Sequence, residues 1–205
     1  MNRRLAVLIS GRGTNLRAIV EAIERGALDA TVAVVISSRP AAAGLMWARE
    51  RGLETVCVEP RAFDERPAYD AAVRDVIRAR EVSLVCLAGF MRLIGAPLLE
   101  AFPYRILNIH PSLLPSFPGL DAQRQALEHG VRLAGATVHL VTAELDGGPI
   151  VLQAAVPVLD GDTVDALSAR ILAEEHRLYP EAIRIVLDGG WRVEGRRFVR
   201  LIEAT

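Results

Sequence analysis

Residues 106–115, Ile106-Leu107-Asn108-Ile109-His110-Pro111-Ser112-Leu113-Leu114-Pro115, predict the strand around which the rest of the fold is arranged. Side chains alternate between the two faces of a strand, so Asn108 and His110 are expected on one face and apolar residues on the other. Pro111 cannot donate a hydrogen bond to a neighbouring strand, and the strand should therefore end at His110 and enter a restrained loop. An amide and an imidazole are thus expected together at a strand end.

Apolar runs of strand length alternate with helical patterns on the N-terminal side of this stretch. Strands are expected over residues 5–10, 31–36, 55–58 and 84–88, and helices over residues 16–23, 41–51 and 64–80. This alternation predicts parallel β-α-β crossovers, and hence an α/β fold with one Rossmann-like domain and a mostly parallel central sheet. In such sheets, ligands bind beyond the carboxyl ends of the strands.

The C-terminal part follows a different pattern. A helix is expected over residues 121–129, closely spaced strands over 135–141 and 150–156, a helix over 163–187 and a hairpin over 191–201. Pro180 should start a new segment or kink the long helix. The close spacing of the strands predicts an antiparallel C-terminal part of the sheet.

Composition restricts the possible functions. The chain has 205 residues and a formal net charge of −1, with no basic run, which argues against nucleic acid or a membrane surface as the main partner. All 24 basic residues are arginine. The lack of lysine excludes Schiff-base chemistry on the protein and the Walker A lysine, so any phosphate must be held by backbone N–H groups, hydroxyls or arginine.

The two cysteines, Cys57 and Cys86, lie in apolar runs and are interpreted as core residues in a reducing, cytoplasmic compartment. The apolar run after Arg4 is too short for a signal peptide, so we expect no targeting or membrane-spanning segment. The histidines lack the spacing of a zinc site, and no metal is expected.

A glycine-rich loop joins the first strand to the first helix. Gly13, Thr14 and Asn15 stand where free N–H groups and the positive end of the helix dipole can hold an anion. Leu16 occupies the position of the third glycine of a dinucleotide fingerprint, so a monophosphate is favoured over NAD. The alternative is a tight turn without a ligand.

Asn108 and His110 suit an acyl-type reaction, in which an imidazolium acts as acid and an amide N–H stabilises an oxyanion. A buried core histidine beside a turn-forming asparagine is the alternative. Asp146, in the turn 145–149, becomes a catalytic candidate only if the fold brings it to His110. Otherwise it is a turn-stabilising aspartate.

Four separated stretches carry one resemblance: LISGRGTNL (8–16), LAGFMR (87–92), LNIHPSLLP (107–115) and LDGGPI (145–150). Together they resemble the folate-dependent glycinamide ribonucleotide formyltransferases of purine biosynthesis over nearly the whole chain. The run from His110 to Pro115 is shared with other enzymes that use formyl carriers. The N-terminal loop, and Glu175-His176 ahead of Tyr179-Pro180, narrow the choice.

The resemblance implies a role for each motif. Asn108, His110 and Asp146 would be catalytic; Gly13, Thr14, Asn15 and Glu175 would bind the ribonucleotide; Arg66, Met91, Arg92, Leu93, Ile94 and Asn108 would bind 10-formyltetrahydrofolate as co-substrate. Residues 1–205 would form one domain, with a phosphate-binding half over 1–105 and a catalytic and folate-binding half over 106–205. Ser116, Asp121 and Gln123 depart from the family pattern, which leaves local phosphate contacts and the pH behaviour of the loop open.

The alternative functions are formyltetrahydrofolate hydrolase, methionyl-tRNA formyltransferase and, in a different class, a Rossmann-like nucleotide-binding protein or oxidoreductase. The resemblance associates the hydrolase with an N-terminal regulatory domain and the tRNA enzyme with a basic C-terminal domain, for which 205 residues leave no room. We expect small-molecule substrates, no nucleic acid or membrane partner, and a monomer or weak homodimer.

Overall fold

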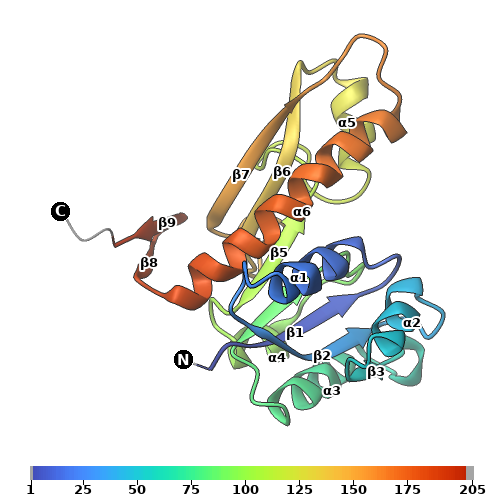
Figure 1. Ribbon diagram of the computed structural model, residues 1–205, viewed down its shortest axis with the longest axis vertical. Helices are drawn as coiled ribbons and strands as arrows, with labels where there is room; N and C mark the ends of the chain where they lie inside the picture. Colours follow the sequence, from blue (N-terminus) through green and yellow to red (C-terminus); the bar gives the residue numbers. More distant parts are fainter. Residues whose placement is uncertain (1, 202–205) are drawn as a thin grey trace. The chain divides into compact units, whose positions relative to one another are not determined.

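The computed structural model describes residues 2–201, which divide into a first unit that ends at Asn108 and a second unit that begins at Ile109. Figure 1 shows their elements. The elements before the boundary are β1 (Arg4–Ile9), α1 (Thr14–Glu24), β2 (Thr31–Ser37), α2 (Ala43–Glu50), β3 (Thr55–Cys57), the 3-10 helix η1 (Pro60–Ala62), α3 (Arg66–Arg78), β4 (Leu84–Leu87) and α4 (Ala96–Ala101). Strand β5 (Ile106–His110) spans the boundary.

The strands of the first unit lie in the order β3-β2-β1-β4-β5, and each neighbouring pair is parallel. This confirms the predicted parallel sheet. Residues Leu5 to Ile9 of β1 have no exposed surface, as expected for a strand covered on both faces. Leu8 pairs with Leu87, and Leu87 pairs with Asn108. Asn108 therefore lies at the carboxyl edge of the sheet, where β1 leads into the glycine-rich loop.

The second unit contains α5 (Ala122–Glu128), β6 (Leu133–Leu140), β7 (Ile150–Pro157), α6 (Val164–Asp188), β8 (Trp191–Glu194) and β9 (Arg197–Arg200). Strands β6 and β7 are antiparallel, and so are β8 and β9, which confirms the predicted antiparallel part and terminal hairpin. One residue pair, Ile150 with Arg197, joins β7 to β9 in parallel. Helix α6 packs against β6 and β7.

Three local features differ from the sequence predictions. Helix α4 was not predicted, because six residues are too few to show a helical period. Of the two outcomes expected for Pro180, a new segment or a kink, the structure excludes the first, since Pro180 lies inside α6. Packing of buried neighbours such as Tyr179 and Ile183 compensates for the hydrogen bond that proline cannot donate. Cys86 is a buried core residue, whereas Cys57 is half-buried.

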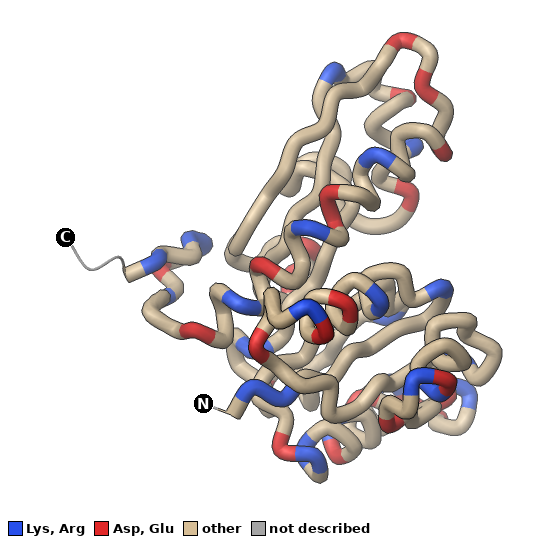
Figure 2. The backbone as a smooth tube through the Cα atoms, in the orientation of Figure 1, with Lys and Arg blue, Asp and Glu red and all other residues tan. Residues whose placement is uncertain are grey.

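Positive and negative residues are interspersed along the helices and connecting segments of each unit (Figure 2). The interior of β1 and the whole of β4 carry no charged residue. Within residues 2–201, no helix has both the length and the apolar content needed to cross a membrane.

Candidate functional site

The glycine-rich loop has the geometry of an anion cradle. Gly13 precedes α1 in the left-handed conformation, with φ at 73°, and Thr14 and Asn15 form the start of the helix. The first N–H groups of a helix have no partner within it and face any ligand at its N-terminus. A Cβ at Gly13 would lie 2.7 Å from the Cα of Gly44, and the Gly44 N–H donates to the Gly11 carbonyl at 3.0 Å. The loop is thus held against the start of α2.

A serine pair joins this loop to the segment that follows β4. The Ser10 hydroxyl lies 2.8 Å from that of Ser38 and accepts from the Met91 N–H at 2.9 Å. The Ser10 N–H donates to the Gly89 carbonyl at 3.0 Å. Neither Ser10 nor Gly44 was singled out from the sequence, because their partners are distant in the chain.

The segment after β4 and the start of α3 enclose a pocket of about 260 Å³. Its lining consists of Arg66, Tyr69, Met91, Arg92 and Leu93. Four of the six predicted folate-binding residues are thus brought together, whereas Ile94 and Asn108 do not line the pocket. The Arg92 guanidinium lies 5.6 Å from the centre of the Tyr69 ring, and burial raises the pKa of Tyr69 to about 12. Two guanidinium groups and two exposed apolar side chains suit a ligand that is both anionic and apolar.

His110 ends β5, two residues after the half-buried Asn108, and its side chain is buried. Its Nδ1 lies 3.5 Å from Asp146 Oδ2, and its Nε2 lies 2.9 Å from the Phe117 carbonyl oxygen. A carbonyl can only accept, so Nε2 is the donor in that hydrogen bond. Because both ring nitrogens face acceptors, the arrangement suits an imidazolium.

Asp146 lies in a turn and also faces His110. Its φ of 50° is a left-handed turn conformation, which aspartate tolerates. Its carboxylate nevertheless reaches beyond its own turn, because Oδ2 accepts from the Gly119 N–H at 2.8 Å and faces His110. Gly148 permits this turn, since a Cβ there would overlap the Leu140 carbonyl oxygen.

A second histidine, His139 on β6, lies on the other side of Asp146. Its Nε2 is 3.7 Å from Asp146 Oδ1, and its Nδ1 is 3.1 Å from the Leu140 carbonyl oxygen. Burial lowers the pKa of His139 below its usual value, which favours the neutral ring. The local sequence around His139 contains no signal that Asp146 is its neighbour.

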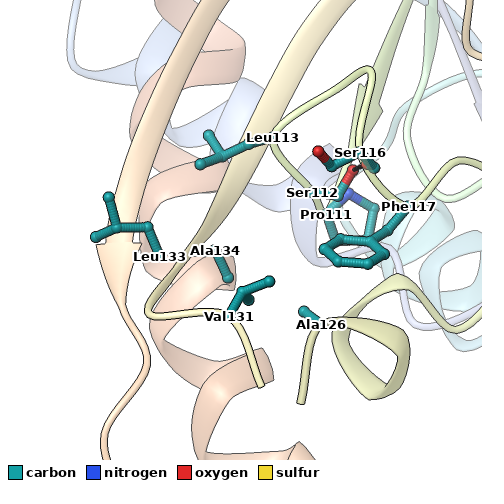
Figure 3. A pocket seen from close by; sticks show the side chains of 9 residues that line it. All are labelled: Pro111, Ser112, Leu113, Ser116, Phe117, Ala126, Val131, Leu133 and Ala134. Atoms are coloured by element: carbon teal, nitrogen blue, oxygen red, sulfur yellow. Dashed lines mark hydrogen bonds between the residues drawn. The ribbon is translucent and has the colours of Figure 1, made fainter. Parts of the chain in front are cut away.

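Thr137 holds the loop after His110 in place. Its hydroxyl donates to the Ser112 carbonyl at 2.6 Å and accepts from the Leu114 N–H at 3.1 Å. Beneath the loop lies a cavity of about 110 Å³ whose lining is mostly apolar (Figure 3). The Ser112 hydroxyl, which lines this cavity, already donates a hydrogen bond to the Ser116 carbonyl oxygen at 2.6 Å. The cavity therefore offers little to a charged substrate.

The remaining predicted positions are more dispersed. Glu175 lies on α6 and is buried, and its suggested contact with a ribose remains a prediction. Ser116 is exposed, Gln123 is half-buried on α5, and Asp121 precedes α5 with φ at 56°.

Comparison with known proteins gives one consistent family. The sequence profile of the formyl transferase family matches residues 3–183. A phosphoribosylglycinamide formyltransferase of Escherichia coli is 46% identical over 185 residues, which are 90% of this chain and 87% of that protein. A trifunctional purine biosynthetic protein, adenosine-3, of Bos taurus is 43% identical over 190 residues, 93% of this chain but only 19% of that protein. The solved structure of glycinamide ribonucleotide transformylase 1 from Symbiobacterium toebii is 60% identical, with a TM-score of 0.96 and coverage of 98% of this chain and 94% of that one. The protein described here therefore belongs to the formyl transferase family.

Proposed function

We propose that this protein transfers the formyl group of 10-formyltetrahydrofolate to the amine of glycinamide ribonucleotide, in purine biosynthesis. The observation that carries the proposal is the buried pair of His110 and Asp146, at the positions where the sequence resembles the catalytic residues of the family. The similarity to the Escherichia coli phosphoribosylglycinamide formyltransferase, of which this chain covers 87%, also supports the proposal.

In the proposed reaction, the primary amine attacks the formyl carbon and forms a C–N bond, which gives a tetrahedral oxyanion. The His110 imidazolium and the Asn108 amide stabilise the oxyanion. Asp146 stabilises the imidazolium and assists the transfer of the proton that the attacking amine loses. The bond from carbon to the folate nitrogen then breaks, and that nitrogen gains the proton, so that formylglycinamide ribonucleotide and tetrahydrofolate are released.

The binding roles follow the chemistry of each group. The N–H groups of Gly13, Thr14 and Asn15 bind the phosphate, and the Glu175 carboxylate accepts hydrogen bonds from the ribose hydroxyls. The pocket that contains Arg66 and Arg92 binds the co-substrate, whose carboxylates match guanidinium groups.

One assay tests the proposal. The purified protein is incubated with 10-formyltetrahydrofolate with and without glycinamide ribonucleotide, and both the formylated product and free formate are measured. We expect formylated product only when the acceptor is present. Equal release of formate with and without acceptor would instead indicate a hydrolase, and no consumption of 10-formyltetrahydrofolate would refute both activities.

A further inference from the structure

Asp70, on α3, is a buried carboxylate to which the proposed reaction gives no role. Its side chain is only 1% exposed. Neither carboxylate oxygen makes a well-formed side-chain hydrogen bond to any group in the described part of the chain. An isolated buried carboxylate is costly, so a charged neighbour must compensate for it.

That neighbour is Arg66, one helical turn earlier. Its Nε lies 3.6 Å from Asp70 Oδ2. Burial raises the pKa of the Asp70 carboxyl, and the Arg66 guanidinium and the Gly95 N–H act in the opposite direction. The backbone also fits closely around the carboxylate, because a Cβ at Gly95 would lie 2.4 Å from Asp70 Oδ2.

The same arginine faces the pocket. The Nε of Arg66 is directed to Asp70, while its side chain is 43% exposed and lines the cavity with Tyr69 and Arg92. Arg92 is oriented separately, above the Tyr69 ring. Asp70 itself does not line the pocket, and of the pocket residues Arg66 is the one with which it forms an ion pair.

We propose that Asp70 is a positioning residue, which holds the Arg66 guanidinium at the pocket so that its free edge receives a carboxylate of the folate co-substrate. The inference rests on the proposed function. An unrestrained arginine loses conformational entropy when it binds a ligand. Because Asp70 restricts the Arg66 side chain before the ligand binds, this entropic cost of binding is reduced. This effect opposes the direct repulsion between Asp70 and a bound carboxylate, and the positive charge of Arg66 beside Asp70 weakens that repulsion.

The test compares two co-substrates in steady-state kinetics: 10-formyltetrahydrofolate and a 10-formyl analogue in which a methylamide replaces the glutamate, so that no carboxylate remains. Asp70→Asn should raise KM for the complete co-substrate roughly two- to tenfold, the range for ordering one long side chain. KM for the truncated analogue and kcat should change little. Asp75→Asn, an exposed site on the same helix, is the matched control and should change none of these values.

A second comparison separates positioning from a merely structural effect. In an Arg66→Ala background, Asp70→Asn should leave KM for the complete co-substrate unchanged, because the residue through which it acts is absent. Equal increases in KM for both co-substrates, the same effect with and without Arg66, or tighter binding by Asp70→Asn would each overturn the inference. Wild-type protein that does not consume 10-formyltetrahydrofolate would instead refute the proposed function itself.

Discussion

A single buried hydroxyl, that of Thr137, fixes the backbone that follows His110. Besides its bonds to Ser112 and Leu114, it accepts from the Gln153 side-chain amide at 2.9 Å. Thr137 has no exposed surface, and Ser112 and Leu114 are buried with it, whereas Gln153 is exposed. The hydroxyl therefore links stability to the position of the catalytic candidate.

Thr137→Val should lower the free energy of unfolding by about 1–3 kcal/mol, because it leaves buried polar groups without their partner. It should also lower kcat, since the loop after His110 is released. Thr137→Ser keeps the hydroxyl and should retain most of both properties. Urea unfolding and steady-state kinetics measure the two effects, and a valine variant as stable and active as the serine variant would contradict this account.

The close approach of Gly13 and Gly44 gives another prediction at this scale. Gly44→Ala places a Cβ 2.8 Å from the Gly13 Cα and 3.0 Å from the end of the Ile9 side chain. We expect a loss of about 1–3 kcal/mol in stability, as is usual for overpacking, together with weaker binding of the ribonucleotide. Gly161→Ala, in open space, is the control. Thermal melts and titration with glycinamide ribonucleotide measure both effects, and Gly44→Ala behaving like this control would refute the close-packing argument.

At the scale of secondary structure, Asp162 fixes the connection between β7 and α6. Its carboxylate accepts two hydrogen bonds from Arg170, at 2.7 and 2.9 Å, and one from the Leu159 N–H at 2.8 Å. The next residue, Thr163, caps α6 by accepting from the Ala166 N–H at 3.2 Å. The hydrogen bonds from Arg170 and Leu159 lower the pKa of Asp162 to about 2.

This lowered pKa predicts how stability depends on pH. Asp162 stabilises the fold at pH values above its ordinary pKa of 3.8, and the stabilisation is lost as the pH falls toward about 2. Asp162→Asn should therefore be less stable than wild type at pH 7, and the difference should shrink at pH 3. Asp160→Asn, with an exposed side chain in the same connection, is the control. Urea unfolding at both pH values measures the difference, and an equal difference at pH 3 and pH 7 would contradict the assignment.

The elements that could be predicted are those marked by local chemistry. Strand β5 has the predicted bounds, because Pro111 ends it, and the helix expected over residues 163–187 is observed as α6. The hydrogen bond from the Gly119 N–H to Asp146 could not be predicted, since 27 residues separate the two in the sequence. The contact between Gly13 and Gly44 could not be predicted either, because the residues around each glycine give no indication of the other.

At the scale of the whole molecule, the proposed roles are divided between the two units. The phosphate-binding loop, the pocket of Arg66 and Arg92, and Asn108 belong to the first unit, whereas His110, Asp146 and Glu175 belong to the second. Strand β5 carries Asn108 and His110 two residues apart on one continuous element. The proposed chemistry therefore depends on β5 as much as on the individual side chains.

The central claim is that His110 and Asp146 act as one catalytic pair. Its most direct test is a double-mutant cycle in the formyl transfer assay, with kcat and KM measured for His110→Ala, Asp146→Asn and the double variant, and thermal melts to confirm folding. Each single change should lower kcat on the order of 10²-fold or more with a much smaller effect on KM. The double variant should lose far less than the product of the two single losses. A folded Asp146→Asn protein that keeps near-wild-type kcat from pH 6 to 9 would contradict the claim and leave Asp146 as a turn residue.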